Sequence, residues 1–251
     1  MRLPQPPVTW LDAGDAFPPL QCAWGEGDPA PGLLAAGGAL DVQTLVQAYG
    51  QGIFPWFSPG QPILWWSPDP RMTLQTAHFK LHRSLKKTLR RFVVEPGCSL
   101  RFDTAFERVI QACANTPREG QPGTWIVPEM IAAYSELHRA GHAHSVETWV
   151  NGELAGGLYC VNLGRMVFGE SMFAHQTDSS KIALAGLVAF CRAKGLPLID
   201  CQQNTGHLAS LGAAAMTRED FVAKASVQTQ LARPQWLFDD LYWQTILTPQ
   251  P

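Results

Sequence analysis

The fold of this 251-residue chain is decided by residues 143–168, which read AHSVETWVNGELAGGLYCVNLGRMVF. Residues 143–150 alternate between apolar and polar side chains, which is typical of a half-buried strand. Asn151-Gly152 is a strong hairpin turn, and residues 153–161 continue as the next strand. Leu163-Gly164 makes a second turn, which leads into a strand at residues 166–168. Consecutive strands joined by tight turns predict an antiparallel meander.

Helical patterns lie on both sides of this meander. The predicted helices are residues 41–49, 79–92, 103–114, 128–140 and 178–193, with a last helix after Thr217. Asp41, Asp103 and Thr217 stand at the N-cap positions that short polar side chains favour. Residues 198–201 form a short buried strand. Because strands come first and strand and helix then mix, we expect an α+β or mixed α/β sheet domain behind a small N-terminal module.

Residues 52–71, GIFPWFSPGQPILWWSPDPR, hold five prolines and three tryptophans but only one acid and one base. Proline fixes φ and lacks an N–H, so no helix passes through and any strand must be short or at an edge. Trp56, Trp65 and Trp66 therefore stand on a stiffened frame. The segment either covers the core of a second domain or forms a stacking platform for a base or an aromatic substrate.

The composition is that of a globular protein: 46 % of residues are hydrophobic, 16 % are charged and the net charge is −2. Its six cysteines form no CxxC pair, which favours reduced thiols and a cytoplasmic location. Residues 1–7 contain no apolar run typical of a signal peptide. The longest apolar stretch, residues 182–191, is too short to cross a bilayer, so we expect no membrane association.

Positive charge is concentrated in residues 79–92, FKLHRSLKKTLRRF, which hold six of the nineteen Lys and Arg residues and no acid. The cations are Lys80, Arg83, Lys86, Lys87, Arg90 and Arg91. Apolar residues can form the opposite stripe of a helix, which leaves one basic face suited to phosphate oxygens. The alternative is an ordinary solvated face, which usually mixes both signs of charge.

Residues 198–202, LIDCQ, place an acid inside a short buried strand, which costs free energy unless the acid is paired or used. Alternation puts Asp200 and Gln202 on one face, with Ile199 and Cys201 on the other. Asp200 could accept or orient a proton, and Gln202 could donate an N–H to a carbonyl that gains charge. The structural alternative is that Asp200 caps a nearby helix or pairs with Lys181.

Other polar residues give weaker indications. Glu170 and Ser171 are expected at the end of a strand. His142 and His144 have no third ligand, so we expect no metal site. Cys201 with His207 suggests a thiol nucleophile, but an inert buried thiol is favoured. No GxxxxGK[ST] run is present, so the sequence indicates no nucleoside triphosphate site.

Several segments together resemble the bacterial leucyl/phenylalanyl-tRNA–protein transferases. They are GLLAAGGAL at 32–40, GIFPWFSPG with PILWWSPDPR at 52–71, GTWI at 123–126, AHSVE at 143–147, GGLY at 156–159, FGESMF at 168–173, and LIDCQ with HLASLGA at 198–213. Order and spacing both fit the family. The segment DSSK at 178–181 departs slightly, because members often have Ala at its second position.

The resemblance implies transfer of leucine or phenylalanine from charged tRNA to the N-terminal amine of proteins that begin with Lys or Arg, which marks them for degradation. It implies a small N-terminal domain, residues 1–70, before an acetyltransferase (GNAT)-like domain, residues 71–251, with a mixed, largely antiparallel sheet. The family's catalytic pair falls on Asp200 and Gln202. Its contacts to the adenosine and the aminoacyl group fall on Trp56, Trp125, Glu170, Met172 and Ile199. We expect a monomer that needs no cofactor.

Two rival functions predict different behaviour. A coenzyme-A-dependent acyltransferase would need a Gly-rich, basic turn that opens a helix and holds the pyrophosphate. The one [RQ]xxGx[GA] run in the sequence, QAYGQG at 47–52, contains no base and lies at the end of the helix predicted at 41–49 instead of opening one. A non-catalytic tRNA-binding protein would keep its tRNA affinity without Asp200 and would have no transfer activity to lose.

Overall fold

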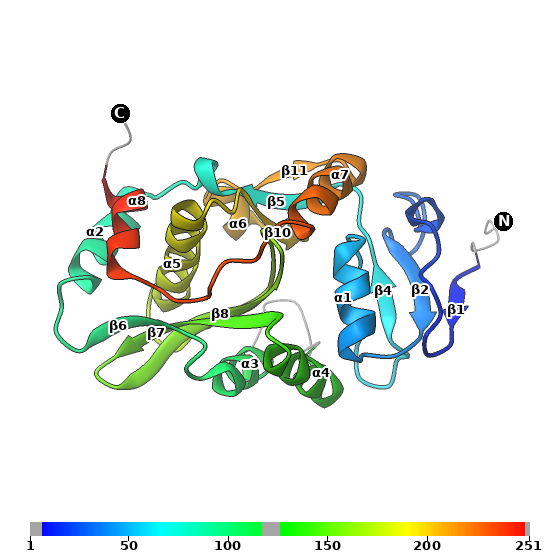
Figure 1. Cartoon of the computed structure of the whole chain (residues 1–251), viewed down its shortest axis with the longest axis horizontal. Coiled ribbons are helices and arrows are strands. Elements are labelled where there is room, and N and C mark those ends of the chain that lie inside the picture. Colours follow the sequence, from blue (N-terminus) through cyan, green and yellow to red (C-terminus); the bar gives the residue numbers. More distant parts are fainter. Residues whose placement is uncertain (1–6, 117–125, 249–251) are drawn as a thin grey trace.

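The computed structural model describes residues 7–116 and 126–248, and its strands form two sheets (Figure 1). The larger sheet has the order β11-β5-β10-β9-β8-β7-β6, and the smaller one has the order β1-β2-β4-β3. In the larger sheet β9 and β10 run parallel, and the other neighbours are antiparallel. The predicted mixed α/β fold with a largely antiparallel sheet is confirmed.

The elements have the following bounds. The strands are β1 (Thr9–Leu11), β2 (Leu33–Gly37), β3 (Phe54–Pro55), β4 (Leu64–Trp66), β5 (Arg71–Gln75), β6 (Cys98–Phe102), β7 (Ala143–Val150), β8 (Glu153–Leu163), β9 (Met166–Ala174), β10 (Leu198–Gln202) and β11 (Ala214–Met216). The α-helices are α1 (Val42–Gly50), α2 (Arg83–Phe92), α3 (Phe106–Asn115), α4 (Pro128–Arg139), α5 (Ser179–Lys194), α6 (Gly206–Ser210), α7 (Arg218–Thr229) and α8 (Gln244–Leu247). Short 3₁₀ helices occupy Leu20–Cys22, Thr76–His78 and Asp240–Trp243.

The predicted meander is strands β7, β8 and β9. Its first turn is Asn151-Gly152, and both residues have positive φ, as the hairpin requires. The third strand is longer than predicted: β9 continues to Ala174, with a register shift opposite Tyr159 and Cys160. Glu170 therefore lies inside a strand and not at its end, which corrects the sequence prediction.

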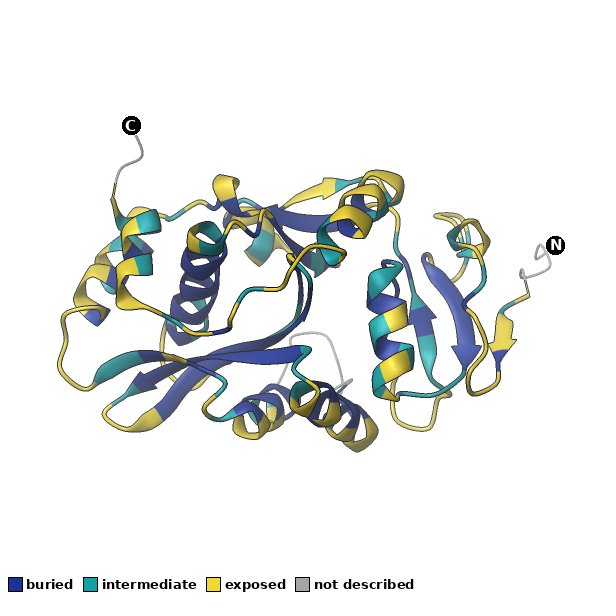
Figure 2. Ribbon diagram, in the orientation of Figure 1, coloured by how far each residue is buried: buried dark blue, intermediate teal, exposed yellow. Residues whose placement is uncertain are grey.

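The larger sheet separates two hydrophobic cores. In Figure 1, α5 lies above β7 and β8, and α3 and α4 lie below them. The apolar face of α2 packs with α5 in one core, and α1, α3, α4 and α7 contribute to the other. Figure 2 shows α5 and the central strands buried along most of their length, whereas α2 is largely exposed. Buried Leu85, Leu89 and Phe92 confirm the apolar stripe predicted for the basic helix.

Two of the three predicted N-caps are confirmed. Asp41 Oδ1 accepts the backbone N–H of Thr44 at 2.9 Å, and Thr217 Oγ1 accepts that of Asp220 at 3.1 Å. The cap predicted at Asp103 is wrong, because α3 begins at Phe106 and Asp103 has a φ of 57°. Its carboxylate instead accepts hydrogen bonds from residues of β7. Within the described ranges, no helix combines the length and apolar character needed to cross a membrane.

Candidate active site

A cavity of about 350 Å³ opens where β9 and β10 separate. The two strands pair at Ile199 with Val167 and at Asp200 with Phe168, after which β9 remains paired with β8 but no longer with β10. The apolar wall of the cavity is formed by Leu158, Met172, Leu184, Leu187 and Ile199. Its polar end is formed by Glu170, Asp200, Gln202, Gln203, Thr205 and His207. Six of the sequence-predicted site residues (Asp200, Gln202, Trp56, Glu170, Met172 and Ile199) are thus brought to one cavity.

The end of β10 is bent. Its pairing with β5 shifts register between Asp200 and Gln202, and Gln202 adopts a φ of 59°. Despite this bulge the predicted division of faces is confirmed. Asp200 bonds an arginine that stacks on rings of the core to which α1, α3, α4 and α7 contribute. Ile199 belongs to the core of α2 and α5, and Cys201 packs against that core.

Asp200 is fully buried and is paired with Arg71, the first residue of β5. Arg71 Nε donates to Oδ1 at 2.8 Å, and Nη2 donates to Oδ2 at 2.6 Å. The structural alternative considered from the sequence is therefore wrong in both its forms. Asp200 caps no helix in the described residues, and Lys181 binds Asp178 at 2.8 Å instead. A bidentate pair of this kind supplies both charge compensation and fixed geometry.

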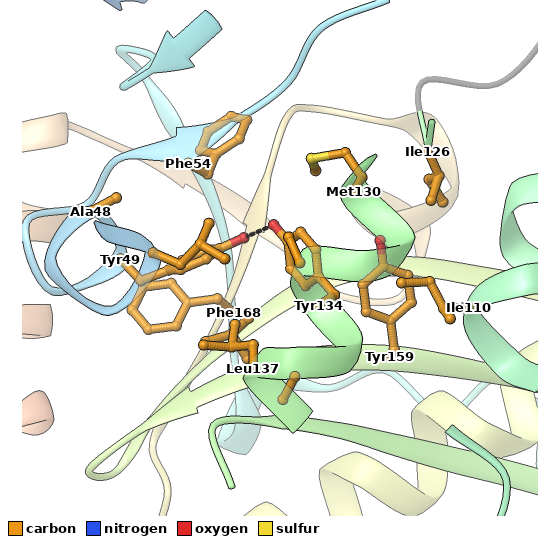
Figure 3. Close-up of a cluster of buried hydrophobic side chains, with 14 of the residues drawn as sticks. Ala48, Tyr49, Phe54, Ile110, Ile126, Met130, Tyr134, Leu137, Tyr159 and Phe168 are labelled. Carbon is orange, nitrogen blue, oxygen red and sulfur yellow. Dashed lines mark hydrogen bonds between the residues drawn. The ribbon is translucent and has the colours of Figure 1, made fainter. Parts of the chain in front are cut away.

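The side chain of Gln202 is fixed by a hydrogen bond. Its Nε2 donates to Glu170 Oε1 at 2.9 Å, across from β10 to β9. Tyr49 of α1 and Tyr134 of α4 donate their hydroxyls to the same carboxylate, at 2.7 Å and 3.3 Å. The two hydroxyls also contact each other, and Figure 3 shows both rings pointing to this meeting point beside Phe168. The network joins α1 and α4 to Gln202.

Burial raises the pKa of Glu170 to about 8, and the hydrogen bond from Tyr49 only partly opposes this shift. The same burial, together with the nearby Glu170, raises the pKa values of Tyr49 and Tyr134 well above their usual range. Near neutral pH the cluster is therefore a set of neutral groups, which a positive charge would shift towards the carboxylate form.

The tryptophans of the Pro-rich segment divide their roles. Trp56 is half-buried and lines the cavity, and Trp66 packs edge-on against it with ring centroids 5.4 Å apart. Trp65 is fully buried and its Nε1 donates to Gly37 O at 2.9 Å. The segment is therefore both a cover for a core and a wall of the cavity. Trp125, the other aromatic residue predicted for the site, lies outside the described residues.

Two weaker candidates are not favoured by the structure. Cys201 lines the cavity, but burial raises the pKa of its thiol far above the usual range, which makes it a poor nucleophile. His144 is stacked on Trp236 and its Nδ1 lies 2.7 Å from Asp103 Oδ2. His207 lines the cavity; burial lowers its pKa, and the positive charge of Lys181 lowers it further.

The basic helix begins beside the cavity. The backbone N–H of Lys80 donates to Leu211 O at 2.8 Å, and His82 Nε2 lies 2.7 Å from Ser210 O. Both acceptors follow the residues of α6 that line the cavity, His207 and Leu208. Of the six cations in residues 80–91, Lys86 is half-buried and the others are exposed; Arg91 lies 3.6 Å from Glu95. A positively charged surface thus extends from the mouth of the cavity along α2.

Three residues of the site were not identified from the sequence: Arg71, Tyr49 and Tyr134. A signal for Arg71 existed, because it is the only base in residues 52–71 and a buried base needs an acid. The tyrosines gave no such signal, since apolar helix faces commonly include tyrosine.

Comparisons with known proteins agree with these motifs. The family described as Leucyl/phenylalanyl-tRNA protein transferase matches residues 73–226, and the family's N-terminal domain matches residues 38–69. A Leucyl/phenylalanyl-tRNA–protein transferase of Polaromonas sp. is 68 % identical over 249 residues, which cover 99 % of this chain and 97 % of that protein. Its namesake in Albidiferax ferrireducens is 62 % identical, with 98 % and 96 % covered.

Among solved structures, L-PGS from Bacillus licheniformis is similar over 68 % of this chain and 55 % of its own, with 11 % identity and a TM-score of 0.37. This score is too low to assign a fold, so the fold class rests on the strand order described above. The sequence relatives are decisive for the family. This chain belongs to the leucyl/phenylalanyl-tRNA–protein transferases, and it is an aminoacyltransferase.

Proposed function

We propose that this enzyme transfers leucine or phenylalanine from charged tRNA to the N-terminal amine of proteins that begin with Lys or Arg. One observation carries the proposal: a single cavity joins an apolar wall to a polar end that holds Glu170 and Gln202. The wall suits the donor's side chain, and the polar end suits a cationic acceptor and a reacting carbonyl.

The aminoacyl end of the tRNA fits the apolar part of the cavity. Met172 and Ile199 would contact the leucine or phenylalanine side chain, since neither offers a hydrogen bond to a polar one. Trp56 presents an aromatic surface to the terminal adenosine, and stacking of this kind contributes about 1–3 kcal/mol per base. Trp125 is assigned the same task on the strength of the family motif alone.

The acceptor brings an N-terminal amine and the positive charge of Lys or Arg. Glu170 is the carboxyl group of the cavity that is not already paired with a cation, because Asp200 is bound by Arg71. A positive charge beside Glu170 would favour its ionised form. Charge complementarity therefore selects a cationic N-terminal residue at this position.

The reaction is aminolysis of an ester. The amine nitrogen bonds to the carbonyl carbon, the ester C–O bond breaks, and a proton passes from the amine to the released tRNA hydroxyl. The ester is already activated, so the enzyme must chiefly supply orientation and stabilisation of the oxyanion. Gln202 donates one amide hydrogen to Glu170 and keeps a second for a carbonyl that gains charge. We assign the catalytic contribution to Gln202 together with Asp200.

The cations on and before α2 (Lys80, Arg83, Lys86, Lys87, Arg90 and Arg91) are proposed to bind phosphates of the tRNA acceptor stem, because the helix begins beside the cavity mouth. Neutralising Arg83, Lys86 and Lys87 together should weaken tRNA binding and lower the slope of log K against log salt concentration by about 2–3. Filter binding across salt concentrations measures this slope. Lys224→Ala, an exposed charge on α7, is the control. A triple variant with the wild-type slope would remove α2 from the interface.

We further propose that residues 1–70 and 71–251 form separate domains, the second GNAT-like, and that the enzyme acts as a cytoplasmic monomer that directs its products to N-degron degradation. The change of sheet at Pro70, between β4 and β5, supports this boundary.

A transfer assay tests the function directly. Labelled leucine on tRNA should pass to a peptide beginning with Arg and not to one beginning with Gly. Equal transfer to both peptides would contradict the proposed acceptor specificity. Transfer from acetyl-coenzyme A instead of tRNA would indicate a coenzyme-A-dependent acyltransferase, and tRNA binding without any transfer would indicate a binding protein.

A further inference from the structure

We propose that Arg71 is a positioning residue of the transfer reaction: through Asp200 it fixes the bent backbone that directs Gln202 into the cavity. The inference rests on the proposed function for the role of Gln202. It assigns positioning, and not proton transfer, to the Arg71–Asp200 pair. It also adds Arg71, the last residue of the Pro-rich segment, to the residues on which the reaction depends.

Arg71 is fully buried, and its guanidinium group is fixed on every side. Its edge binds both oxygens of Asp200, and Nη1 donates to Gly52 O at 3.3 Å. Its central carbon Cζ lies 4.7 Å from the ring centroid of Phe54 and 4.7 Å from that of Phe221. Arg71 therefore joins three segments: the Pro-rich segment, α7 and β10. It does not line the cavity in the described structure, so it acts only through its neighbours.

The neighbour that transmits this effect is Asp200. Its Oδ1 accepts the backbone N–H of Gln202 at 2.9 Å while also binding Arg71 Nε. That N–H belongs to the bulge, where Gln202 has a φ of 59°. A residue other than glycine in the left-handed region costs free energy and persists only where its surroundings hold it there. The Arg71–Asp200 pair supplies the hydrogen bond to the backbone N–H of this residue.

The bulge decides where the Gln202 side chain lies. From this backbone position Nε2 reaches Glu170 on β9, which Tyr49 and Tyr134 hold in turn. Gln202 is thus fixed at two points, its backbone by Asp200 and its amide by Glu170. An aspartate whose oxygens are both bound by a guanidinium is a poor proton acceptor, because protonation would break a buried ion pair. Positioning is the role that this geometry leaves to Asp200.

Arg71→Lys keeps the positive charge but loses the bidentate geometry. We expect kcat to fall about 100-fold, as a misplacement near 1 Å can do. The KM for leucyl-tRNA should change less than threefold, because the cavity wall is untouched. Arg192→Lys, which alters an arginine that bonds backbone carbonyls outside the cavity, is the control and should keep the wild-type kcat. An Arg71→Lys enzyme with wild-type kcat would overturn the proposal.

A double variant separates positioning from a general structural defect. If Arg71 acts through Gln202, Arg71→Lys combined with Gln202→Ala should be no slower than Gln202→Ala alone. If the loss of kcat in the double variant equalled the product of the two single losses, the two residues would act independently and the proposal would be overturned. For Asp200→Asn we expect a lower kcat with an unchanged shape of the pH–rate profile, whereas loss of the acidic limb alone would make Asp200 the base.

A spectroscopic measurement covers the case of an inactive enzyme. In full-length protein labelled with ¹⁵N-glutamine, the backbone amide signal of Gln202 should move in Arg71→Lys and stay in place in Arg192→Lys. An unmoved signal would overturn the proposal even if activity were low. If the wild type transferred nothing from leucyl-tRNA, the proposed function would fail, but this signal would still report whether Arg71 holds the bulge.

Discussion

Two glutamates of the larger sheet, Glu147 and Glu170, differ in how fully their carboxylate groups are hydrogen-bonded. Glu147 of β7 is fully buried and accepts five hydrogen bonds, from Thr104 (backbone and hydroxyl), Ala105, Ser145 and Trp149. Glu170 of β9 is half-buried at the cavity and accepts three, from Tyr49, Tyr134 and Gln202. A carboxylate offers about four lone-pair sites, so Glu147 is saturated and Glu170 is not.

This difference indicates which acid is available to a ligand. The donors around Glu147 include the backbone N–H groups of Thr104 and Ala105, the two residues before α3, so this side chain holds the corner between β6 and α3. Glu170 leaves acceptor capacity facing a cavity. Burial of an acid is therefore not in itself a sign of function, whereas unfilled capacity beside a cavity is.

The largest effect expected from this comparison is on stability. Glu147→Ala would leave two backbone N–H groups and three side-chain donors without their partner, and each unsatisfied buried group costs about 1–3 kcal/mol. We expect the free energy of unfolding to fall by about 4 kcal/mol or more, measured by urea denaturation. Glu107→Ala, an exposed acid on α3, should change it by less than about 0.5 kcal/mol. A stable Glu147→Ala protein would mean that the corner is held by packing alone.

The next effect is on activity and concerns Glu170. Glu170→Gln keeps the size of the side chain but cannot take on the negative charge that a bound cation favours, so the proposed cationic acceptor loses a charged partner worth about 1.5–3 kcal/mol. We expect kcat/KM for a peptide beginning with Arg to fall about 10–100-fold, with the KM for leucyl-tRNA unchanged. Steady-state kinetics with each substrate varied in turn measures both. If the KM for leucyl-tRNA changed instead, Glu170 would belong to the site that binds the aminoacyl donor.

Much of the fold could be predicted because its signals are local. The meander follows from alternation and from Asn151-Gly152, and the cap at Asp41 bonds a residue only three positions away. Asp103 misled for the opposite reason. The donors that bind its carboxylate, from His144 and Ser145 of β7, are 41 and 42 positions away, and no local pattern predicts that contact.

The site could be predicted in its residues but not in its contacts. The motif around Asp200 gave the acid and the amide, yet the partner of the acid, Arg71, is 129 positions away. Alternation predicted the right faces for Asp200 and Gln202, but the bulge between them depends on that distant pair. Tyr49 and Tyr134 lie 85 positions apart and meet only after α1 and α4 pack together.

The smallest expected effect is a proton released when the peptide binds. With its pKa raised to about 8 by burial, Glu170 is mostly protonated at pH 7. A cationic peptide end beside it lowers that pKa, so binding should release up to about one proton per peptide. Calorimetry in two buffers of different ionisation enthalpy counts this proton, with a peptide beginning with Arg as the ligand. Glu170→Gln should release correspondingly less, and equal release by both proteins would show that the proton comes from the peptide's own amine.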